Sequence, residues 1–264
     1  MNFEVLISTM HKDKQEIYFM LIDMNISCDA IVIVQGDSRG YDEITLSRGK
    51  ARIFYTKDRG LSKSRNMALK HSKADIVLLA DDDLFYYDYF DQEVIKTFKE
   101  NGWVDIIIFN IDSYKKTFPI KTKELSFWTV LGFSSCQIAF RRKSVLSKNI
   151  CFNESFGSGS GVYYSGEDNI FLSECFKCFR VFYVPIKILK RIESSSSWFD
   201  GFNEKYLFDR GAIFYAISRK YFWVLMIQFA IRKKKFCQSF SFYKIFKLMF
   251  SGYLDYKKSG RDNS

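Results

Sequence analysis

Three consecutive acidic residues close a largely apolar segment, and their spacing suggests metal chemistry. Asp81, Asp82 and Asp83 follow residues 74–80 in the sequence ADIVLLADDD. Carboxylates packed this closely repel one another, so either a solvated turn or a bound cation must relieve the repulsion. Mg²⁺ and Mn²⁺ prefer oxygen ligands and are commonly held by one or two carboxylates together with substrate phosphates. The cluster therefore predicts a divalent cation that in turn binds a diphosphate, with a solvated turn as the competing interpretation.

A basic segment lies shortly before this cluster and could bind an anion. In KDRGLSKSRN (57–66), Arg59, Lys63 and Arg65 surround a glycine and the predicted start of a helix. Helix N-termini and arginine side chains both suit phosphate groups. A solvated basic helix face is the competing interpretation. We expect Ser62 to be the N-cap of this helix.

The elements that would position these residues are predicted from the apolar patterning of the chain. The expected strands cover residues 3–9, 29–38, 51–56, 74–83 and 104–112, and the expected helices cover residues 12–25, 62–72 and 89–102. Apolar strands that alternate with helices predict an α/β fold, with a mostly parallel central sheet flanked by helices. Such sheets bind ligands at the carboxyl ends of their strands, where Ser8, Thr9, Asp37 and the acidic cluster would meet.

Composition and charge narrow the class of protein. The chain has 264 residues, of which 47% are hydrophobic, so it can bury a sizeable core and is not a disordered chain. Lys and Arg number 40 against 30 Asp and Glu, which favours anionic partners such as nucleotides, nucleic acid or anionic lipid. A lone CxxC at Cys175 and Cys178 has no second pair or nearby histidine. The N-terminal sequence lacks the basic region of a signal peptide, so we expect a cytoplasmic protein with reduced thiols.

The character of the chain changes near residue 190. A polar stretch, ESSSSWFDG (193–201), is followed by two segments rich in aromatic, apolar and basic residues, 211–236 and 241–258. The apolar run within the first segment is about half the roughly 20 residues that a membrane-spanning helix needs. We expect helices that lie on an anionic membrane surface. A packed helical subdomain and a dimer contact are the competing interpretations.

Four motifs together resemble family 2 glycosyltransferases with the GT-A fold, of the type that builds bacterial polysaccharide, O-antigen or capsule. They are VIVQGDS, RGLSKSRNMAL, ADIVLLADDD and SGEDNIF, which occur in this order across about residues 3–190. In that family the corresponding segments are a strand that ends in an acidic turn, an R-N-like segment, a strand that ends in D-x-D, and an E-D motif that opens a helix. The acidic turn here reads Gln35-Gly36-Asp37-Ser38, a departure from the usual D-D-G-S.

The resemblance implies an inverting reaction that depends on Mn²⁺ or Mg²⁺. Asp168 would be the base that takes the proton of the acceptor hydroxyl, and Glu167 would orient acceptor or sugar hydroxyls. An acidic first turn favoured by the helix dipole is the competing interpretation of this pair. The residues implied in nucleotide-sugar binding are Ser8, Thr9, Asp37, Arg59, Ser62, Arg65, Asp81 and Asp82, and the implied metal ligands are Asp81 and Asp83.

The resemblance also implies a division of the chain and a class of substrate. Residues 1–190 would form the GT-A catalytic domain, with a nucleotide-sugar half at 1–112 and an acceptor half at 113–190, and residues 191–264 would be a helical extension. Within the acceptor half, residues 127–140 are predicted to form strands. The donor would be a nucleoside-diphosphate sugar, with UDP as the nucleotide usual in the family. The acceptor would be a glycan or lipid-linked oligosaccharide in cell-surface polysaccharide synthesis, on the inner face of the membrane. Because the Q-x-x-R-W signature of processive members is absent, we expect transfer of single sugars.

Two other classes of function remain open at this point. A nucleotidyltransferase also combines acidic strand ends, Mg²⁺ and a basic loop, but the segment STMHKDKQE (8–16) lacks the glycine-rich activating loop of that class. A nucleic-acid-binding protein would fit the positive charge. The chain shows no RRM, KH or zinc-finger signature, so we expect no nucleic-acid partner.

Overall fold

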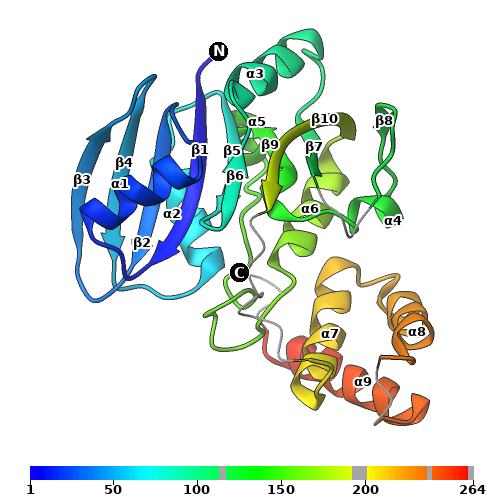
Figure 1. The fold of residues 1–264 in the computed structure, drawn as a ribbon. Coiled ribbons are helices and arrows are strands. Elements are labelled where there is room, and N and C mark those ends of the chain that lie inside the picture. Colours follow the sequence, from blue (N-terminus) through cyan, green and yellow to red (C-terminus); the bar gives the residue numbers. More distant parts are fainter. Residues whose placement is uncertain (113–116, 192–200, 237–239, 261–264) are drawn as a thin grey trace.

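The computed structural model describes residues 1–112, 117–191, 201–236 and 240–260 (Figure 1). Within these residues, ten strands form one sheet in the order β3-β4-β2-β1-β5-β9-β7-β10-β6, with β8 paired to β10. The strands are β1 (Phe3–Met10), β2 (Ala30–Gln35), β3 (Gly40–Thr45), β4 (Lys50–Thr56), β5 (Ile76–Asp81), β6 (Leu84–Tyr86), β7 (Ile106–Asp112), β8 (Lys123–Glu124), β9 (Ile138–Arg141) and β10 (Val181–Arg191).

The helices lie on both faces of this sheet and in a separate group formed by the last three (Figure 1). They are α1 (Lys14–Asp23), α2 (Leu61–His71), α3 (Phe90–Glu100), α4 (Phe127–Val130), α5 (Arg142–Ser147), α6 (Glu167–Cys178), α7 (Glu204–Ile217), α8 (Phe222–Lys233) and α9 (Phe242–Lys258), with a 3₁₀ helix η1 (Ser135–Gln137). The α/β class predicted from the sequence is confirmed.

The direction of the strands explains why distant residues meet at one edge of the sheet. Strands β4, β2, β1 and β5 run parallel to one another. Strand β9 runs antiparallel to both β5 and β7, so β7 points the same way as β5. The carboxyl ends of β1, β2, β4, β5 and β7 therefore share one edge, where ligands of such sheets bind.

The predicted strands and helices of residues 3–112 all form, as β1, β2, β4, β5, β7 and α1 to α3. Two short strands, β3 and β6, were not predicted, because β3 is a polar edge strand and β6 has three residues. The prediction of strands over residues 127–140 is largely wrong. This stretch begins with α4 and η1, and only its last residues belong to β9, because capping boxes at Ser126 and Ser134 start helical turns there.

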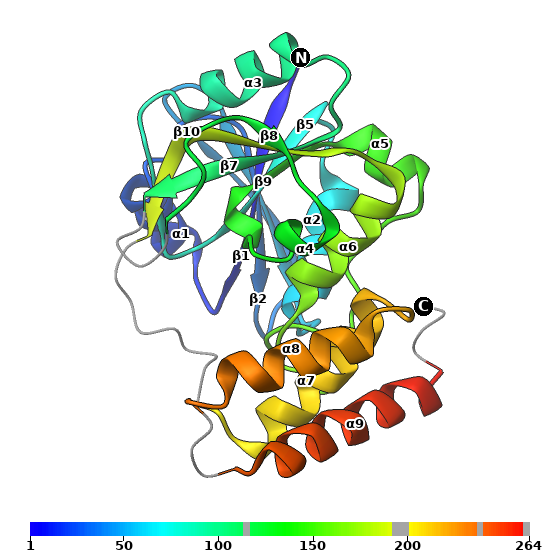
Figure 2. The ribbon, with the colours of Figure 1, turned by 90° about the vertical axis from the view of Figure 1, so that its right-hand side faces the viewer.

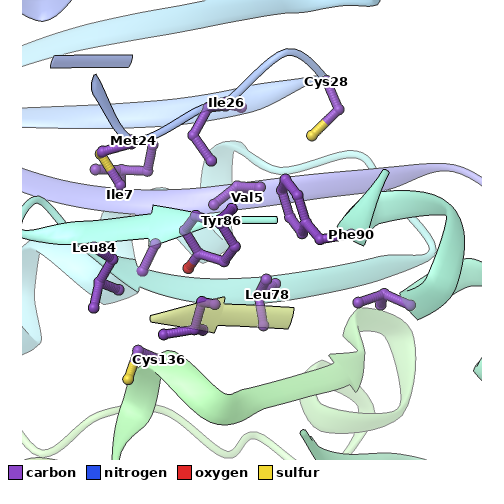
Figure 3. Packing of buried hydrophobic residues seen from close by; sticks show 14 of the residues in the cluster. Val5, Ile7, Met24, Ile26, Cys28, Leu78, Leu84, Tyr86, Phe90 and Cys136 are labelled. Carbon is purple, nitrogen blue, oxygen red and sulfur yellow. The ribbon is translucent and has the colours of Figure 1, made fainter. Parts of the chain in front are cut away.

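Buried apolar side chains hold the sheet rigid beneath this edge. The rings of Tyr86 and Phe90 lie 4.4 Å apart and pack beside Val5 of β1 and Leu78 of β5 (Figure 3). The strands are buried along almost their whole length, with Val5 and Leu78 fully inaccessible. Because both faces of β1 and β5 are covered, the positions of their carboxyl ends are fixed by packing.

The three C-terminal helices form one packed group, which we call the C-terminal helical unit, at one end of the molecule (Figures 1 and 2). Helices α7 and α9 cross closely at two glycines, which leave no room for a side chain. A Cβ built on Gly211 would lie 1.6 Å from the Met249 carbonyl oxygen, and one built on Gly252 would lie 1.8 Å from the Phe208 carbonyl oxygen. Most of the predicted polar stretch at 193–201 lies outside the described residues. Within the described residues, none of the helices has the length and apolar character needed to cross a bilayer.

Candidate active site

Arg65 is the centre of the candidate site. Its guanidinium group is almost fully buried and donates to carboxylates from two distant elements. Nη2 lies 2.9 Å from Asp81 at the end of β5, and Nη1 lies 2.5 Å from Asp168 in the first turn of α6. Nη1 also lies 3.4 Å from Glu167. One arginine of α2 therefore joins the acidic end of β5 to the acidic start of α6. Its bonds to both are charge-assisted hydrogen bonds, and the planar guanidinium group fixes their geometry.

Asp168 is held on both of its carboxylate oxygens. Oδ1 accepts from Arg65, and Oδ2 accepts from the backbone N–H of Ser135, 2.9 Å away. The Ser135 hydroxyl in turn accepts from Arg65 at 2.8 Å. The Asp168 side chain keeps 21% of its surface exposed, whereas Glu167 keeps 11%. Of the two acidic residues, Asp168 is therefore the more accessible to a substrate hydroxyl.

Burial gives Glu167 an unusual protonation equilibrium. The pKa of Glu167 is raised to about 7, first by desolvation and then by the negative charge of Asp168, against the opposing effect of Arg65. Its carboxylate packs against Gly157, where an added Cβ would lie 3.3 Å from Oε2. A carboxylate with a pKa near neutrality can exchange protons at physiological pH, which is typical of functional sites.

The acidic cluster after β5 faces the same edge. Burial raises the pKa of Asp81, and the charges of Asp168 and Asp83 raise it further while Arg65 lowers it. Asp82 accepts a 2.5 Å hydrogen bond from the hydroxyl of Thr9, and Ser8 lies opposite Asp81 in the β1–β5 register. Thr9, Asp81 and Asp82, predicted from distant segments, thus lie together.

The residues of this cluster fit a divalent cation that takes only two of its ligands from the protein. Within the described residues, no group of three His, Cys, Asp or Glu side chains is arranged to hold a metal ion. Asp81 and Asp83 supply carboxylate oxygens near enough for the charge of Asp83 to affect the pKa of Asp81. Two carboxylates match the way Mg²⁺ and Mn²⁺ are bound when substrate phosphates and water complete the shell.

Two more predicted residues pair at the end of β2. Arg59 Nη2 lies 3.0 Å from Oδ1 of Asp37, and its Nη1 lies 2.9 Å from Nε2 of His11. Asp37 is strongly exposed, with 90% of its side-chain surface accessible. An exposed carboxylate and guanidinium group at the strand ends could contact the base and phosphates of a nucleotide, so both remain candidates.

Ser62 and Arg65 have different surroundings from those expected. The helix α2 begins at Leu61, so its N-cap is Gly60 and not Ser62. Gly60 has a φ of +119°, and its N–H donates to the side-chain oxygen of Gln35. Ser62 is buried and donates its hydroxyl to the Phe156 carbonyl oxygen, which ties α2 to the 153–166 segment. Arg65 is likewise surrounded by protein carboxylates, and its role in binding the nucleotide sugar stays a prediction.

Sequence reasoning missed Ser135, Gln35 and Gly157. Ser135 binds Asp168 through its backbone, and any residue type has a backbone N–H, so side-chain chemistry gave no signal. Gln35 is buried and positions Gly60, but glutamine at a strand end is common. The glycine-rich composition of residues 156–166 was the one available signal for Gly157, and it identified a loop without assigning a contact to it.

Comparison with known proteins is consistent with this geometry. A family model described as "Glycosyl transferase family 2" matches residues 25–166. That range includes Asp37, Arg65 and the acidic cluster and ends just before Glu167. Among curated proteins, none matches the chain.

Solved structures of S. aureus TarS share the fold. The structure of TarS residues 1–349 superposes with a TM-score of 0.59 at 14% identity, over 90% of this chain and 73% of that one. The same region in complex with UDP gives 0.58 at 16% identity, over 90% and 73%. The complex with UDP-GlcNAc gives 0.57 at 13% identity, over 98% of this chain and 92% of that one. At this identity the likeness concerns the fold, and it confirms the GT-A architecture.

Proposed function

The chain belongs to glycosyl transferase family 2, and from this premise we propose that it transfers a single sugar from a nucleoside-diphosphate sugar to an acceptor hydroxyl. The observation that carries the proposal is the guanidinium group of Arg65, which joins Asp81 at the end of β5 to Asp168 at the start of α6. The two groups have different tasks in such a transfer, one at the donor diphosphate and one at the acceptor hydroxyl. Arg65 would keep them at a fixed separation.

The reaction we propose inverts the anomeric centre. Asp168 takes the proton of the acceptor hydroxyl while the oxygen of that hydroxyl attacks the anomeric carbon of the donor sugar. The bond from that carbon to the diphosphate oxygen breaks, and its electron pair leaves with the nucleoside diphosphate. When bound, Mn²⁺ or Mg²⁺ would neutralise charge on the diphosphate, and Asp81 and Asp83 would hold it. Glu167, beside Asp168 and Arg65, would orient a hydroxyl.

The donor we propose is a UDP-sugar. Structures of TarS that share this fold are described in complex with UDP and with UDP-GlcNAc, which supports a uridine nucleotide here. Asp37 and Arg59 would meet the nucleotide at the end of β2, and Ser8, Thr9 and Asp82 would line the diphosphate side. The acceptor we propose is a glycan or lipid-linked oligosaccharide used in cell-surface polysaccharide synthesis.

A donor screen tests this function. Purified protein is incubated with Mn²⁺ or Mg²⁺ and a panel of nucleotide sugars, and release of nucleoside diphosphate is measured. We expect slow hydrolysis of one donor, dependent on the metal. Asp168→Asn should keep the affinity for that donor and lose about 10²–10⁴-fold in transfer, the usual contribution of a general base. Release of pyrophosphate from a nucleoside triphosphate and a sugar phosphate would instead identify a nucleotidyltransferase.

We also propose that the enzyme works on the inner face of the cell membrane, held there by one face of α8. Trp223, Ile227 and Ile231 follow at intervals of four residues and are 53%, 37% and 65% exposed. We call them the α8 stripe. The basic residues Arg232 to Lys235 follow directly after the stripe. Exposed apolar side chains beside basic ones are typical of a helix that lies on anionic lipid.

A further inference from the structure

The C-terminal helical unit contacts the segment that leads into α6. Residues 153–166, within the predicted acceptor half, lead to the first turn of α6, which carries Glu167 and Asp168. Phe156, Tyr163 and Ile170 share one hydrophobic cluster with residues of α7, α8 and α9. Tyr163 donates its hydroxyl to Asp255 of α9 at 2.7 Å. The catalytic segment and the helical unit therefore have a common core.

One face of α7 binds the backbone of this segment at two adjacent points. Lys205 donates from Nζ to the carbonyl oxygen of Val162 at 2.7 Å. Asp209, one turn later, accepts the backbone N–H of Tyr164 on Oδ2 at 3.0 Å. Lys205 also pairs with Oδ1 of Asp209 and lies 4.6 Å from the centre of the Tyr164 ring. Asp209 is 2% exposed, so loss of its carboxylate would leave the Tyr164 N–H without its acceptor in a largely buried place, whereas the Lys205 bond lies nearer the solvent.

The same helix face supports the start of α6. Ile213 lies one further turn along α7 and packs on Gly166, the N-cap of α6, where an added Cβ would lie 2.6 Å from Cγ1 of Ile213. Gly166 has a φ of +97°, a conformation that glycine adopts without strain. Lys205, Asp209 and Ile213 therefore line up along residues 162–166, which immediately precede Glu167 and Asp168.

We propose that α7 is a positioning element of the active site: Lys205 and Asp209 fix residues 162–164, and through them the place of Asp168 relative to Arg65. The proposal rests on the proposed function for the role of Asp168. A displacement of about 1 Å at a reacting group can lower the rate by about 100-fold, so small shifts in this segment matter. Neither Lys205 nor Asp209 contacts substrate in this assignment, and both act through the backbone of the segment.

Three variants test the proposal, with donor hydrolysis or transfer as the activity. Asp209→Ala removes the acceptor of the Tyr164 N–H, and Asp209→Asn keeps an oxygen there. Lys205→Met removes the bond to Val162 at a side chain that is 42% exposed. The matched control is Lys244→Gln, which breaks an exposed ion pair between α9 and Glu204 of the same helical unit. Donor affinity is measured separately by calorimetry.

We expect Asp209→Ala to lower kcat by about 10- to 100-fold while donor affinity stays within about 3-fold of the wild type. Asp209→Asn should recover most of the rate, Lys205→Met should lose several-fold, and Lys244→Gln should match the wild type. Wild-type kcat in both Asp209→Ala and Lys205→Met would overturn the proposal, and so would an equal loss of donor affinity and kcat. If Asp209→Ala does not fold, Lys205→Met decides alone.

Hydrogen exchange separates this proposal from the proposed function. In the wild type the amide of Tyr164, which donates to the buried carboxylate of Asp209, should exchange slowly, and Asp209→Ala should speed its exchange without altering that of β1 and β5. This result needs no substrate, so it holds or fails even if the donor screen finds no glycosyl transfer. Unchanged exchange of the Tyr164 amide in Asp209→Ala would overturn the proposed role of α7.

Discussion

Arg65 relieves a repulsion that the chain itself creates. Asp81, Glu167 and Asp168 come from β5 and α6 and would otherwise bring three carboxylates together in a largely buried site. The positive charge of a fully buried guanidinium group offsets their mutual repulsion, and its planar shape sets their directions. Arg65 is therefore both a structural residue of the core and a determinant of the geometry of the candidate site.

Arg65→Met should destabilise the protein in a pH-dependent way. Removal of one partner from a buried ion pair costs about 3–5 kcal/mol, because the other charges stay buried without compensation. Arg65 lowers the pKa of Asp81 and of Glu167, so without it both pKa values rise in the folded state and the folded variant takes up protons as the pH falls. The stability deficit should therefore be largest above pH 7 and smaller near pH 5, as measured by urea unfolding at several pH values.

A matched control for this variant is Arg52→Met. Arg52 is also mostly buried and pairs at 2.6 Å with a single carboxylate, Glu4, far from the candidate site. It should show a smaller pH dependence of stability and keep donor hydrolysis, whereas Arg65→Met should lose it. Equal pH profiles for the two variants would contradict the assignment of three carboxylates to Arg65.

Glu167→Gln should change how stability depends on pH. The pKa of Glu167 is about 7 in the folded protein, above its ordinary value of 4.5, so the folded state binds the proton more tightly than the unfolded chain. This stabilisation is fully present below the unfolded pKa and is lost as the pH rises through 7. The wild type should therefore lose stability across this window relative to Glu167→Gln, by on the order of 1–3 kcal/mol.

Chemical unfolding at pH 4.5, 6 and 8 measures that difference. The exposed Glu100→Gln on α3 serves as a control for the loss of one carboxylate. For Glu100→Gln, the difference from the wild type in the free energy of unfolding should not change with pH. If the difference for Glu167→Gln is equally constant, the raised pKa of Glu167 is wrong.

At the level of helices and strands, the sequence predicted what local patterning encodes. Continuous apolar runs gave β1, β2, β4, β5 and β7, because buried parallel strands are apolar on both faces. The polar edge strand β3 has no such run, and it forms because β4 offers an open edge. The stretch 127–140 is apolar and aromatic, but capping residues and burial around η1 decide its structure, and these depend on tertiary neighbours.

For the candidate site, the sequence predicted which residues take part but not how they contact one another. Asp81, Asp168 and Arg65 were identified from their types and from motif order, and the fold brings all three together. Their contacts could not be predicted, because a salt bridge between residues 65 and 168 depends on how α6 docks. The same holds for Lys205 and Asp209, which look like an ordinary surface pair on a helix until the segment they bind is in place.

The close crossing of α7 and α9 gives a sharp prediction for Gly211→Ala. Alanine in an exposed helix is favoured over glycine by up to about 1 kcal/mol, but here its Cβ would lie 1.6 Å from the Met249 carbonyl oxygen. The clash should dominate, separate the two helices and lower stability by about 1–3 kcal/mol. Transfer activity should fall as well, because α7 holds the segment before α6.

Thermal unfolding and donor hydrolysis together check this prediction. The control is Gly102→Ala, where an added Cβ has no atom within 4 Å, so stability and activity should stay near those of the wild type. A Gly211→Ala protein with wild-type stability would contradict the close approach of α7 to Met249.

The candidate site lies at one edge of the sheet and is rich in carboxylates, whereas the C-terminal helical unit has an outer face with exposed apolar side chains. The packing of α8 settles which of its aromatic residues can reach outward. Phe222 stacks on Tyr253 at 4.6 Å and Phe229 packs on Phe214 at 5.6 Å, so these two rings belong to the core of the unit. The α8 stripe faces away from that core, and Lys233 and Lys235 lie over the ring of Phe236 at its end.

The last prediction concerns binding of this face to lipid. Wild-type protein should co-sediment with liposomes that contain anionic lipid, stay in the supernatant with neutral liposomes, and be released as salt rises, because screening weakens the attraction. Each basic residue near an anionic surface contributes about 1 kcal/mol, so replacement of Arg232, Lys233, Lys234 and Lys235 by Gln should abolish co-sedimentation. Donor hydrolysis, which does not need the membrane, should survive.

A charge-matched control separates the α8 face from the net charge of +10. Replacement of four exposed lysines outside the C-terminal helical unit, Lys70, Lys73, Lys96 and Lys99, removes the same charge and should leave lipid binding intact. Trp223→Ser with Ile227→Ser should weaken binding at both salt concentrations, because the α8 stripe contributes apolar burial that salt does not screen. If wild-type protein ignores lipid charge and stays in the supernatant throughout, the α8 stripe contacts another protein surface, and the membrane assignment is wrong.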